Sequence, residues 1–224
     1  MRRHVSFDLW MTLIRPNPAF KIKRAEAIAR MCNLPQSECL QIQSVVIEQD
    51  LAFDRYNEMT GRKAPARYMY HKVLEKIKPG AGSPEASEYL FNESNRLFAD
   101  TPPLFLHRNV PAVLSGLHNE GISLNIGSNT GYIEGPAMRL TIEVMDVAKY
   151  FSFMIFSDEV GVSKPSPAFF GHISREAGIP EAQILHVGDN LKADYHGALR
   201  CGLKAMAVAN QYYTIDDIKQ ALYA

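Results

Sequence analysis

The chain has 224 residues, and its 24 basic and 24 acidic side chains give a formal net charge of zero at pH 7. This balance argues against a global field that recruits nucleic acid or an anionic membrane surface. The length suits one compact enzyme-sized unit with a sizeable core and room for a small second module. Because no run approaches the roughly 20 apolar residues of a membrane span, and the apolar run after Arg3 is too short for a signal peptide, we expect no membrane partner.

The three cysteines, Cys32, Cys39 and Cys201, show no CxxC or other metal-ligand spacing. Reduced, packed thiols are the simplest interpretation of such cysteines, and they favour a cytoplasmic location. The sequence leaves the oligomeric state open.

The first part of the chain predicts one strand followed by four helices. An apolar strand at about residues 4–9 leads into a Pro-rich exit, where Asn17 is placed to cap a helix over 18–32. Apolar residues at helical spacing predict a second helix over about 37–59, ended by Gly61. Two further helices, over about 65–78 and 84–99, flank a break rich in Pro and Gly. Together these helices predict an all-helical cap inserted after the first strand.

From Val110 onward, predicted strands alternate with predicted helices. The strands lie at about 123–128, 152–157, 184–187 and 204–208, and the helices at about 110–120, 134–148, 167–177, 191–201 and from 215. This alternation is typical of a parallel sheet covered on both faces. We therefore predict an α/β fold, with a doubly wound, Rossmann-like core formed by residues 1–15 and 103–224 and a helical cap domain formed by residues 16–102.

Polar side chains follow several of the predicted strands at the point where each one ends. In open α/β sheets, ligands bind just beyond the carboxyl ends of the strands, so these side chains are candidates for one shared site. The first strand ends on Asp8, an acid that is costly to bury unless its surroundings use it. The candidates after the later strands are Ser128 with Asn129, Asp158 and Glu159 with Lys164 beyond them, and Asp189 with Asp194.

In this order the segments resemble the haloacid dehalogenase-like (HAD) hydrolase superfamily. Its four motifs are an Asp-x-Asp-x-Thr strand end, a Ser or Thr, a Lys, and an acidic Gly-Asp-x-x-x-x-Asp loop. The matching positions are Asp8 with Thr12, Ser128, Lys164, and Asp189 with Asp194. The resemblance extends from about residue 4 to about residue 210, with the stretch from Leu13 to about Pro103 matching only as a helical insert. It implies a hydrolase but says little about the substrate.

The resemblance also implies a role for each matching residue. Asp8 would be the nucleophile, attacking phosphorus to form an aspartyl phosphate or carbon to form an ester. Mg²⁺ would be held by the Asp8 carboxylate, the backbone carbonyl of Trp10 and the Asp189 carboxylate, with Asp194 in its outer shell. Lys164 would neutralise the carboxylates and bind a phosphate oxygen, to which Ser128 and Asn129 would also donate. Thr12 would close the loop after the nucleophile.

The residue two positions after Asp8 departs from the phosphatase pattern. Phosphatases of this superfamily have a second Asp there as general acid and base, whereas this chain has Trp10, and Met11 replaces the usual Gly. An indole cannot carry a proton to or from a leaving oxygen. General acid–base help is worth roughly 10²- to 10⁴-fold, or about 3 to 5 kcal/mol of barrier. Turnover should therefore suffer unless another group substitutes, for which His71 and Glu58 of the cap are candidates whose positions the sequence does not fix.

Three functions are compatible with these motifs. The first is Mg²⁺-dependent hydrolysis of a small phosphomonoester, with water, a cap residue or the substrate itself replacing the missing acid. The second is 2-haloacid dehalogenase chemistry, because such enzymes of the superfamily also lack the second Asp and carry an aromatic residue there. Those enzymes need no metal and lose the first acid of the last motif, whereas Asp189 is present here. The third is a non-catalytic relative that binds a phosphorylated ligand or a protein. We favour the first.

Clues to the substrate are weaker. Arg15 lies in the loop after the first strand, which must border the site, and an arginine binds carboxylate or phosphate bidentately. Charged and aromatic residues also cluster in the predicted cap. Such a density is typical of a solvated helix face with packed rings, and the same residues would reach an anionic or planar substrate if they faced the site. This cluster comprises Arg55, Tyr56, Arg62, Arg67, Tyr68, Tyr70 and His71. Asp158 and Glu159 are further candidates for the outer shell of the metal.

Overall fold

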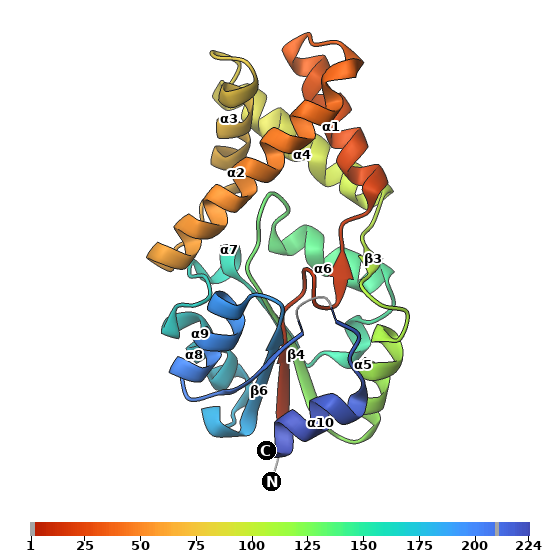
Figure 1. Ribbon diagram of the computed structural model, residues 1–224, viewed down its shortest axis with the longest axis vertical. Coiled ribbons are helices and arrows are strands. Elements are labelled where there is room, and N and C mark those ends of the chain that lie inside the picture. Colours follow the sequence, from red (N-terminus) through yellow and green to blue (C-terminus); the bar gives the residue numbers. More distant parts are fainter. Residues whose placement is uncertain (1–2, 209–210) are drawn as a thin grey trace.

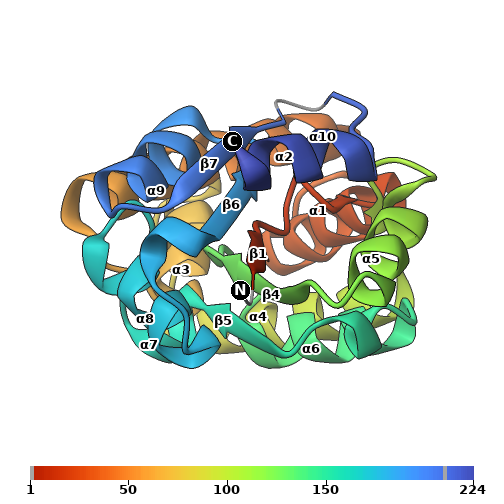
Figure 2. The same cartoon turned by 90° about the horizontal axis from the view of Figure 1, so that it is seen from below.

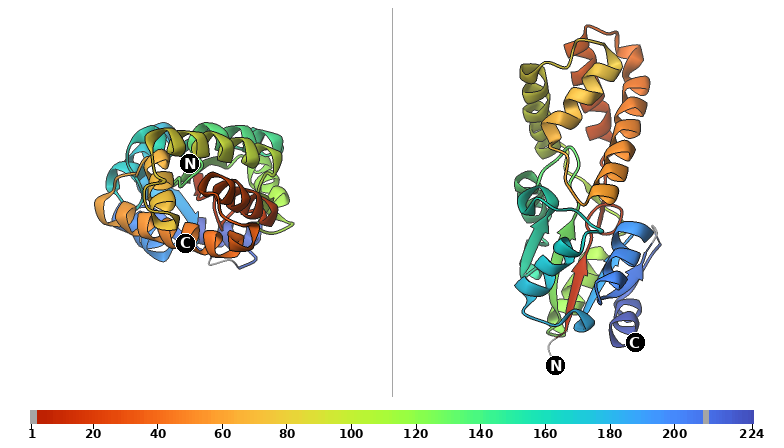
Figure 3. Two further views of the ribbon diagram at one scale, coloured as in Figure 1. Left: turned by 90° about the horizontal axis from the view of Figure 1, so that it is seen from above. Right: turned by 90° about the vertical axis from the view of Figure 1, so that its left-hand side faces the viewer.

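The computed structural model describes residues 3–208 and 211–224 of the chain. Figure 1 shows an α/β core that carries both chain ends at one pole, with a group of helices, the cap, above the opposite pole. The right-hand view of Figure 3 shows the same elongated shape, with the cap stacked on the end of the sheet. The carboxyl ends of the strands therefore lie on the side of the core that carries the cap.

The core is built on a five-stranded sheet in which all the neighbouring strands run parallel. The strand order is β5-β4-β1-β6-β7, so the first strand of the chain lies at the centre. The strands are β1 (His4–Phe7), β4 (Ser123–Ser128), β5 (Phe153–Phe156), β6 (Ile184–Gly188) and β7 (Lys204–Ala207). Asp8 follows directly after the last residue of β1. Because β1 is the central strand, Asp8 lies in the middle of the sheet edge.

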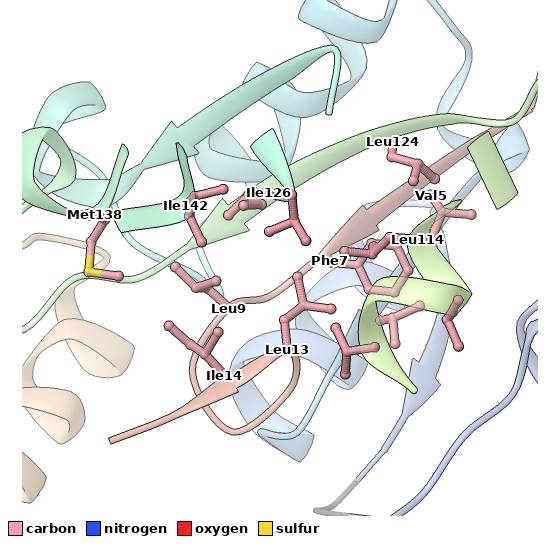
Figure 4. Packing of buried hydrophobic residues seen from close by; sticks show 14 of the residues in the cluster. Val5, Phe7, Leu9, Leu13, Ile14, Leu114, Leu124, Ile126, Met138 and Ile142 are labelled. Atoms are coloured by element: carbon pink, nitrogen blue, oxygen red, sulfur yellow. The ribbon is translucent and has the colours of Figure 1, made fainter. Parts of the chain in front are cut away.

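Helices cover both faces of this sheet, as the end-on view in Figure 2 shows. On one face, apolar residues of β1 and β4 pack with α5 (Val110–Asn119), α6 (Gly135–Val144) and α10 (Ile215–Tyr223). Figure 4 shows part of this cluster, with Val5 and Phe7 near Leu114 and Leu124. The other face is covered by α8 (Pro167–Ala177) and α9 (His196–Arg200), whose Phe169, Phe170 and Ala198 form a second cluster. Burial on both faces holds the strand ends rigidly.

The cap consists of four helices: α1 (Pro18–Cys32), α2 (Cys39–Thr60), α3 (Ala66–Ile77) and α4 (Pro84–Asp100). The Asn17 side chain accepts a hydrogen bond from the amide of Ala19 and so caps α1, as expected from the sequence. Gly61, at a φ of 67°, ends α2 in the left-handed region that favours glycine. The cap has an apolar cluster of its own, which includes Ile28, Val73 and Leu90.

A two-stranded antiparallel ribbon joins the cap to the core. It pairs β2 (Ile14–Arg15) with β3 (Leu104–Phe105). Beside it, the side-chain amide of Asn17 donates to the Pro102 carbonyl at 3.0 Å. The junctions that we predict between core and cap lie next to this ribbon. The ribbon itself is not predicted from the sequence, because each strand has only two residues and is held by a partner about 90 positions away.

Several predicted element boundaries are corrected by the structure. The first strand ends at Phe7, so Asp8 follows it, and the helix expected over 134–148 ends at Val144. The helix expected over 191–201 is divided into a π-helical turn, η4 (Leu191–Tyr195), and α9. A short helix, α7 (Ser157–Val160), and three 3₁₀ turns, η1 (Gln36–Glu38), η2 (Ala148–Tyr150) and η3 (Glu181–Gln183), are additions. Within the described residues, none of the helices combines the length and the apolar character needed to span a membrane.

Candidate active site

Asp8 lies directly beyond β1, and its amide donates to the Val187 carbonyl at 2.8 Å, which extends the pairing of β1 with β6. The residue is only 6% exposed. The Thr12 hydroxyl donates to Oδ2 of Asp8 at 3.1 Å, and the Ser128 hydroxyl donates to Oδ1 at 3.3 Å. Hydrogen bonds from two hydroxyls hold the buried carboxylate in one orientation.

Lys164 supplies the positive charge in this part of the core. Its side chain is fully buried, and its Nζ donates to Oδ1 of Asp8 at 2.8 Å and to the Gly127 carbonyl at 2.8 Å. The same Nζ lies 2.6 Å from Oδ1 of Asp194. Burial by itself lowers the pKa of Lys164, but Asp194 and Asp8 outweigh that effect and raise it, so the ammonium group stays charged.

Asp194 is held beneath the acidic loop by a dense set of contacts. Its Oδ2 accepts from the Asn190 amide at 3.0 Å, and its Oδ1 lies 3.1 Å from Nε2 of His186. Burial favours the neutral acid, but Lys164 and His186 outweigh it and hold the pKa of Asp194 well below its usual range. A Cβ at Gly188 would meet Cγ of Asp194 at 2.3 Å. Only glycine therefore allows this approach.

One cation in this site faces three carboxylates. Asp8, Asp189 and Asp194 each offer an oxygen, and these oxygens lie within 4.8 Å of one another. Burial, followed by the charges of Asp8 and Asp194, raises the pKa of Asp189 to about 7, although Lys164 opposes the shift. An oxygen donor set with excess negative charge is the environment that Mg²⁺ prefers. The residues present therefore fit a hard divalent cation.

A cavity of about 350 Å³ opens above Asp8, between the core and the cap. Its core-side lining includes Asp8, Lys164, Asp189 and the loop from Asn129 to Ile133, and its cap-side lining comes from α1 and α2. The cap contributes Phe20, Lys21, Arg24, Ala25, Gln43, Val46, Ile47, Asp50, Asp54 and Glu58. A substrate bound at Asp8 would thus be enclosed by charged residues of both signs from the cap.

Trp10 stands where the phosphatase pattern places a general acid. Its half-buried ring lies 6.2 Å from that of Phe98, centroid to centroid, and lines the cavity. The neighbouring Met11 has a φ of 57°, which a glycine would adopt without strain. The turn after Asp8 keeps its left-handed residue although the glycine is absent, and the Trp10 side chain offers no proton.

The structure brings most of the predicted site residues together. Asp8, Thr12, Ser128, Lys164 and Asp194 form one continuous set of contacts, which Asp189 borders. Asn129 also lines the cavity, but its side chain bonds to both the amide and the carbonyl of Lys164, at 2.8 and 3.0 Å. It therefore positions the Lys164 loop.

Other predicted residues lie elsewhere. Arg15 is exposed on β2 and does not line the cavity. Asp158 accepts from the Gly135 amide, and Glu159 pairs with Arg139. The seven charged and aromatic cap residues all belong to the described part of the chain, and none lines the cavity; Arg67, for example, pairs with Glu88.

Four charged cap residues in the cavity wall were missed by sequence reasoning. They are Lys21 and Arg24 of α1 and Asp50 and Asp54 of α2. Arg24 lies over the rings of Phe20 and Tyr132, 5.0 and 5.1 Å from their centroids. A charged residue on a helix carries no local signal for the face that meets another domain, so helical periodicity alone does not single these residues out.

A family profile for haloacid dehalogenase-like hydrolases matches residues 3–202, which is most of the chain. The buried Asp8–Lys164 contact and the acidic loop beside it lie within this match. The chain belongs to the haloacid dehalogenase-like hydrolase family, as the sequence motifs predict. It is accordingly a hydrolase by family.

Relatives with similar sequences include named phosphatases. Phospholysine phosphohistidine inorganic pyrophosphate phosphatase from Mus musculus is 26% identical over 196 residues, which cover 84% of this chain and 71% of that protein. Phosphoglycolate phosphatase from Salmonella paratyphi A is 32% identical over 108 residues, which cover 48% of this chain and 41% of that protein. The match thus spans only about two fifths of the length of that phosphoglycolate phosphatase.

Solved structures share the fold. The HAD-hydrolase YfnB from Bacillus subtilis, bound to magnesium, superposes with a TM-score of 0.76 at 14% identity, with all of both chains covered. A 2-haloacid dehalogenase from Pseudomonas syringae gives a TM-score of 0.64 at 22% identity, covering 100% of this chain and 99% of that one. At these identities the likeness establishes the fold alone. The predicted combination of a Rossmann-like core and a helical cap is confirmed.

Proposed function

We propose that this protein is a Mg²⁺-dependent phosphomonoester hydrolase that acts on a small phosphorylated molecule in the cytoplasm, through an aspartyl phosphate on Asp8. The observation that carries the proposal is the buried Asp8–Lys164 contact beside the carboxylates of Asp189 and Asp194. The phosphatase names of the relatives support the same reaction class.

In this proposal the chain's own residues divide the work between attack and charge neutralisation. Asp8 attacks phosphorus, held in orientation by the hydroxyls of Thr12 and Ser128. Lys164 lies where its ammonium group can donate to a phosphoryl oxygen, and Asn129 fixes the backbone of Lys164. Asp194 keeps Lys164 charged and in place.

The carboxylates of Asp8 and Asp189 and the carbonyl of Trp10 would hold Mg²⁺, with Asp194 in its outer shell. When bound, the ion would supply charge neutralisation for the phosphoryl group. The excess negative charge among these carboxylates favours this assignment over a metal-free site.

Haloacid dehalogenase chemistry is the second candidate, and Trp10 is the observation that favours it. Asp189 weighs against it, because it places a third carboxylate beside Asp8 and Asp194. In a metal-free site, a substrate carboxylate would meet these three carboxylates, with Lys164 as the one cation among the described residues in contact with them. A non-catalytic binding role is the remaining alternative.

The test is steady-state hydrolysis of p-nitrophenyl phosphate by the wild type with Mg²⁺ and with EDTA, and by Asp8→Asn with Mg²⁺. We expect turnover that EDTA abolishes, and a loss of at least 10³-fold in Asp8→Asn, because the nucleophile is removed. Asp8→Asn should retain its fold by circular dichroism. Metal-independent release of chloride from 2-chloropropionate would instead support the dehalogenase, and inactivity in both assays would reject both enzymes.

A further inference from the structure

The active site lacks a proton donor on the core side. Among the core residues at the reaction centre, Trp10 cannot transfer a proton and Asp8 is the nucleophile. Asp189 is assigned to Mg²⁺ in the proposed function, and Asp194 is held ionised beside Lys164. Hydrolysis of a phosphate ester with a basic leaving group needs a donor at the leaving oxygen. That oxygen points away from the in-line nucleophile, toward the cap.

The C-terminal part of α2 is attached to the core beside the catalytic loops. Glu58 accepts a hydrogen bond from the side-chain amide of Asn190, the residue after Asp189, at 3.0 Å. It also forms an ion pair with Lys192 at 2.9 Å. The Gly61 carbonyl accepts from the Ser163 amide at 2.8 Å, next to Lys164. Figure 1 shows this end of α2 reaching the core. These contacts fix which face of α2 is turned toward the cavity.

Asp50, Asp54 and Glu58 are spaced four residues apart, so they share this face of α2, and all three line the cavity. Glu58 is engaged by Asn190 and Lys192. Within the described residues, neither Asp50 nor Asp54 makes a side-chain hydrogen bond or ion pair. Burial raises the pKa of Asp50, although Arg24, Lys63 and Lys21 oppose the shift. Asp54 lies about one helical turn from Glu58 and Asp50 about two turns, so Asp54 is the unpaired cap acid closer to the catalytic loops.

We infer that Asp54 is the general acid and base of this active site, supplying from the cap the proton transfer that Trp10 cannot provide. This inference rests on the proposed phosphatase function. It assigns to a cap residue a role that the phosphatase pattern gives to a residue next to the nucleophile.

The charges around Asp54 agree with this role. Partial removal of water from around the carboxyl group is the largest cause that raises the pKa of Asp54, to about 7. The negative charges of Asp50, Glu58 and Asp8 add to this shift, and Lys63 opposes it. Asp54 is exposed, so water in the cavity screens part of this effect. A carboxyl group that exchanges its proton near neutral pH serves both as acid and as base.

The proton balance is complete with this one group. In the first step an oxygen of Asp8 bonds to phosphorus, the bond from phosphorus to the leaving oxygen breaks, and the carboxylic acid of Asp54 protonates that oxygen. In the second step water attacks phosphorus, the bond to Asp8 breaks, and the Asp54 carboxylate takes the proton from water. Phosphate and the alcohol are the products, and both carboxyl groups return to their starting state.

The experiment compares Asp54→Asn with the wild type on two substrates, p-nitrophenyl phosphate and an alkyl phosphate such as glycerol phosphate. We expect kcat/KM for the alkyl phosphate to fall at least 10²-fold, because its alkoxide leaves poorly without a proton. For p-nitrophenyl phosphate, kcat/KM reports only the steps up to the aspartyl phosphate and should change less than tenfold. Its kcat should fall, with a burst of p-nitrophenolate equal to the enzyme concentration, because the second step lacks its base.

Two variants control for charge and folding. Asp54→Glu keeps a carboxyl group and should recover part of the activity on the alkyl phosphate. Glu48→Gln removes an acid of the same helix that pairs with Lys76 inside the cap, and it should match the wild type. Equal losses on the two substrates, or none on either, would overturn the role of Asp54 while leaving the phosphatase intact. Wild-type inactivity on both substrates would overturn the phosphatase proposal and this inference together.

Discussion

Polar side chains within the central strands show how individual residues prepare the core for a charged site. His4 and Ser6 of β1 are fully buried, and each bonds to a polar residue on a neighbouring strand. His4 Nε2 lies 2.8 Å from Oδ1 of Asn125, and the Ser6 hydroxyl lies 3.1 Å from Nδ1 of His186. His186 in turn contacts Asp194. The polar residues of the strands thus extend the contacts of the active site into the core.

His4 makes the stability of the protein dependent on pH. Burial lowers the pKa of His4 below its ordinary value of 6.5, and the hydrogen bond to Asn125 opposes this only in part. As the pH falls below 6.5, the unfolded chain takes up a proton that the folded protein refuses, so stability is lost. We expect the free energy of unfolding of the wild type to fall by up to about 1.4 kcal/mol per pH unit from this residue.

The measurement is urea denaturation of the wild type and His4→Gln across pH 7.5 to 5. The variant should lose less stability over this interval than the wild type, whatever its stability at pH 7.5. Parallel curves for the two proteins would show that His4 does not contribute to the acid sensitivity.

At the scale of elements, α2 connects substrate enclosure to the catalytic loops. Its final turn bonds to the loop after Asp189 and to the segment before Lys164, whereas its first turns pack within the cap. Glu58, whose side chain is 14% exposed, makes two of these contacts, one with Asn190 and one with Lys192.

We expect Glu58→Ala to loosen this attachment by about 1 kcal/mol, the upper range for an ion pair that retains solvent contact. Amide hydrogen exchange in residues 54–61 should become several-fold faster, and KM should rise. Glu48→Ala, which breaks the ion pair with Lys76 inside the cap, is the matched control and should leave exchange in residues 54–61 unchanged. Unaltered exchange in Glu58→Ala would place the attachment elsewhere.

At the scale of the whole molecule, each domain contributes side chains to the apolar cluster of the other domain. Phe20 and Phe98 of the cap pack with the core cluster, and Tyr132 of the core packs with the cap cluster. Tyr132 lies 4.8 Å from Tyr70, centroid to centroid, and its hydroxyl donates to the Val46 carbonyl at 3.3 Å. Each apolar cluster is therefore completed by the other domain.

Because each apolar cluster contains side chains of both domains, we expect cap and core to unfold together. Tyr132→Ala should lower the free energy of unfolding by about 3 kcal/mol, as expected for truncation of a buried aromatic ring. Calorimetry should show a single transition for the wild type and a broader or divided transition for the variant. A variant that keeps one sharp transition at an unchanged temperature would show that the domains are joined by other contacts.

The sequence by itself determined the core and the chemical groups that it carries. Asp8, Ser128, Lys164 and Asp189 each follow an apolar strand or a turn signal, and parallel strands bring their carboxyl ends to one edge of a sheet. The cap helices are marked by local periodicity and by caps such as Asn17 and Gly61. These features depend on residues that are neighbours in the sequence, so they can be predicted without knowledge of the tertiary structure.

Only the tertiary structure decided which cap residues meet the site. Arg24 and Asp54 line the cavity, while Arg15 and Arg67 do not, although all four are charged residues in or beside the cap. Which face of a helix turns toward another domain depends on contacts between distant residues, such as Glu58 with Asn190 and β2 with β3. Such contacts produce no local sequence pattern, because the sequence around each partner is that of an ordinary surface residue. The residues that the cap presents to the cavity therefore depend on the packing of cap against core.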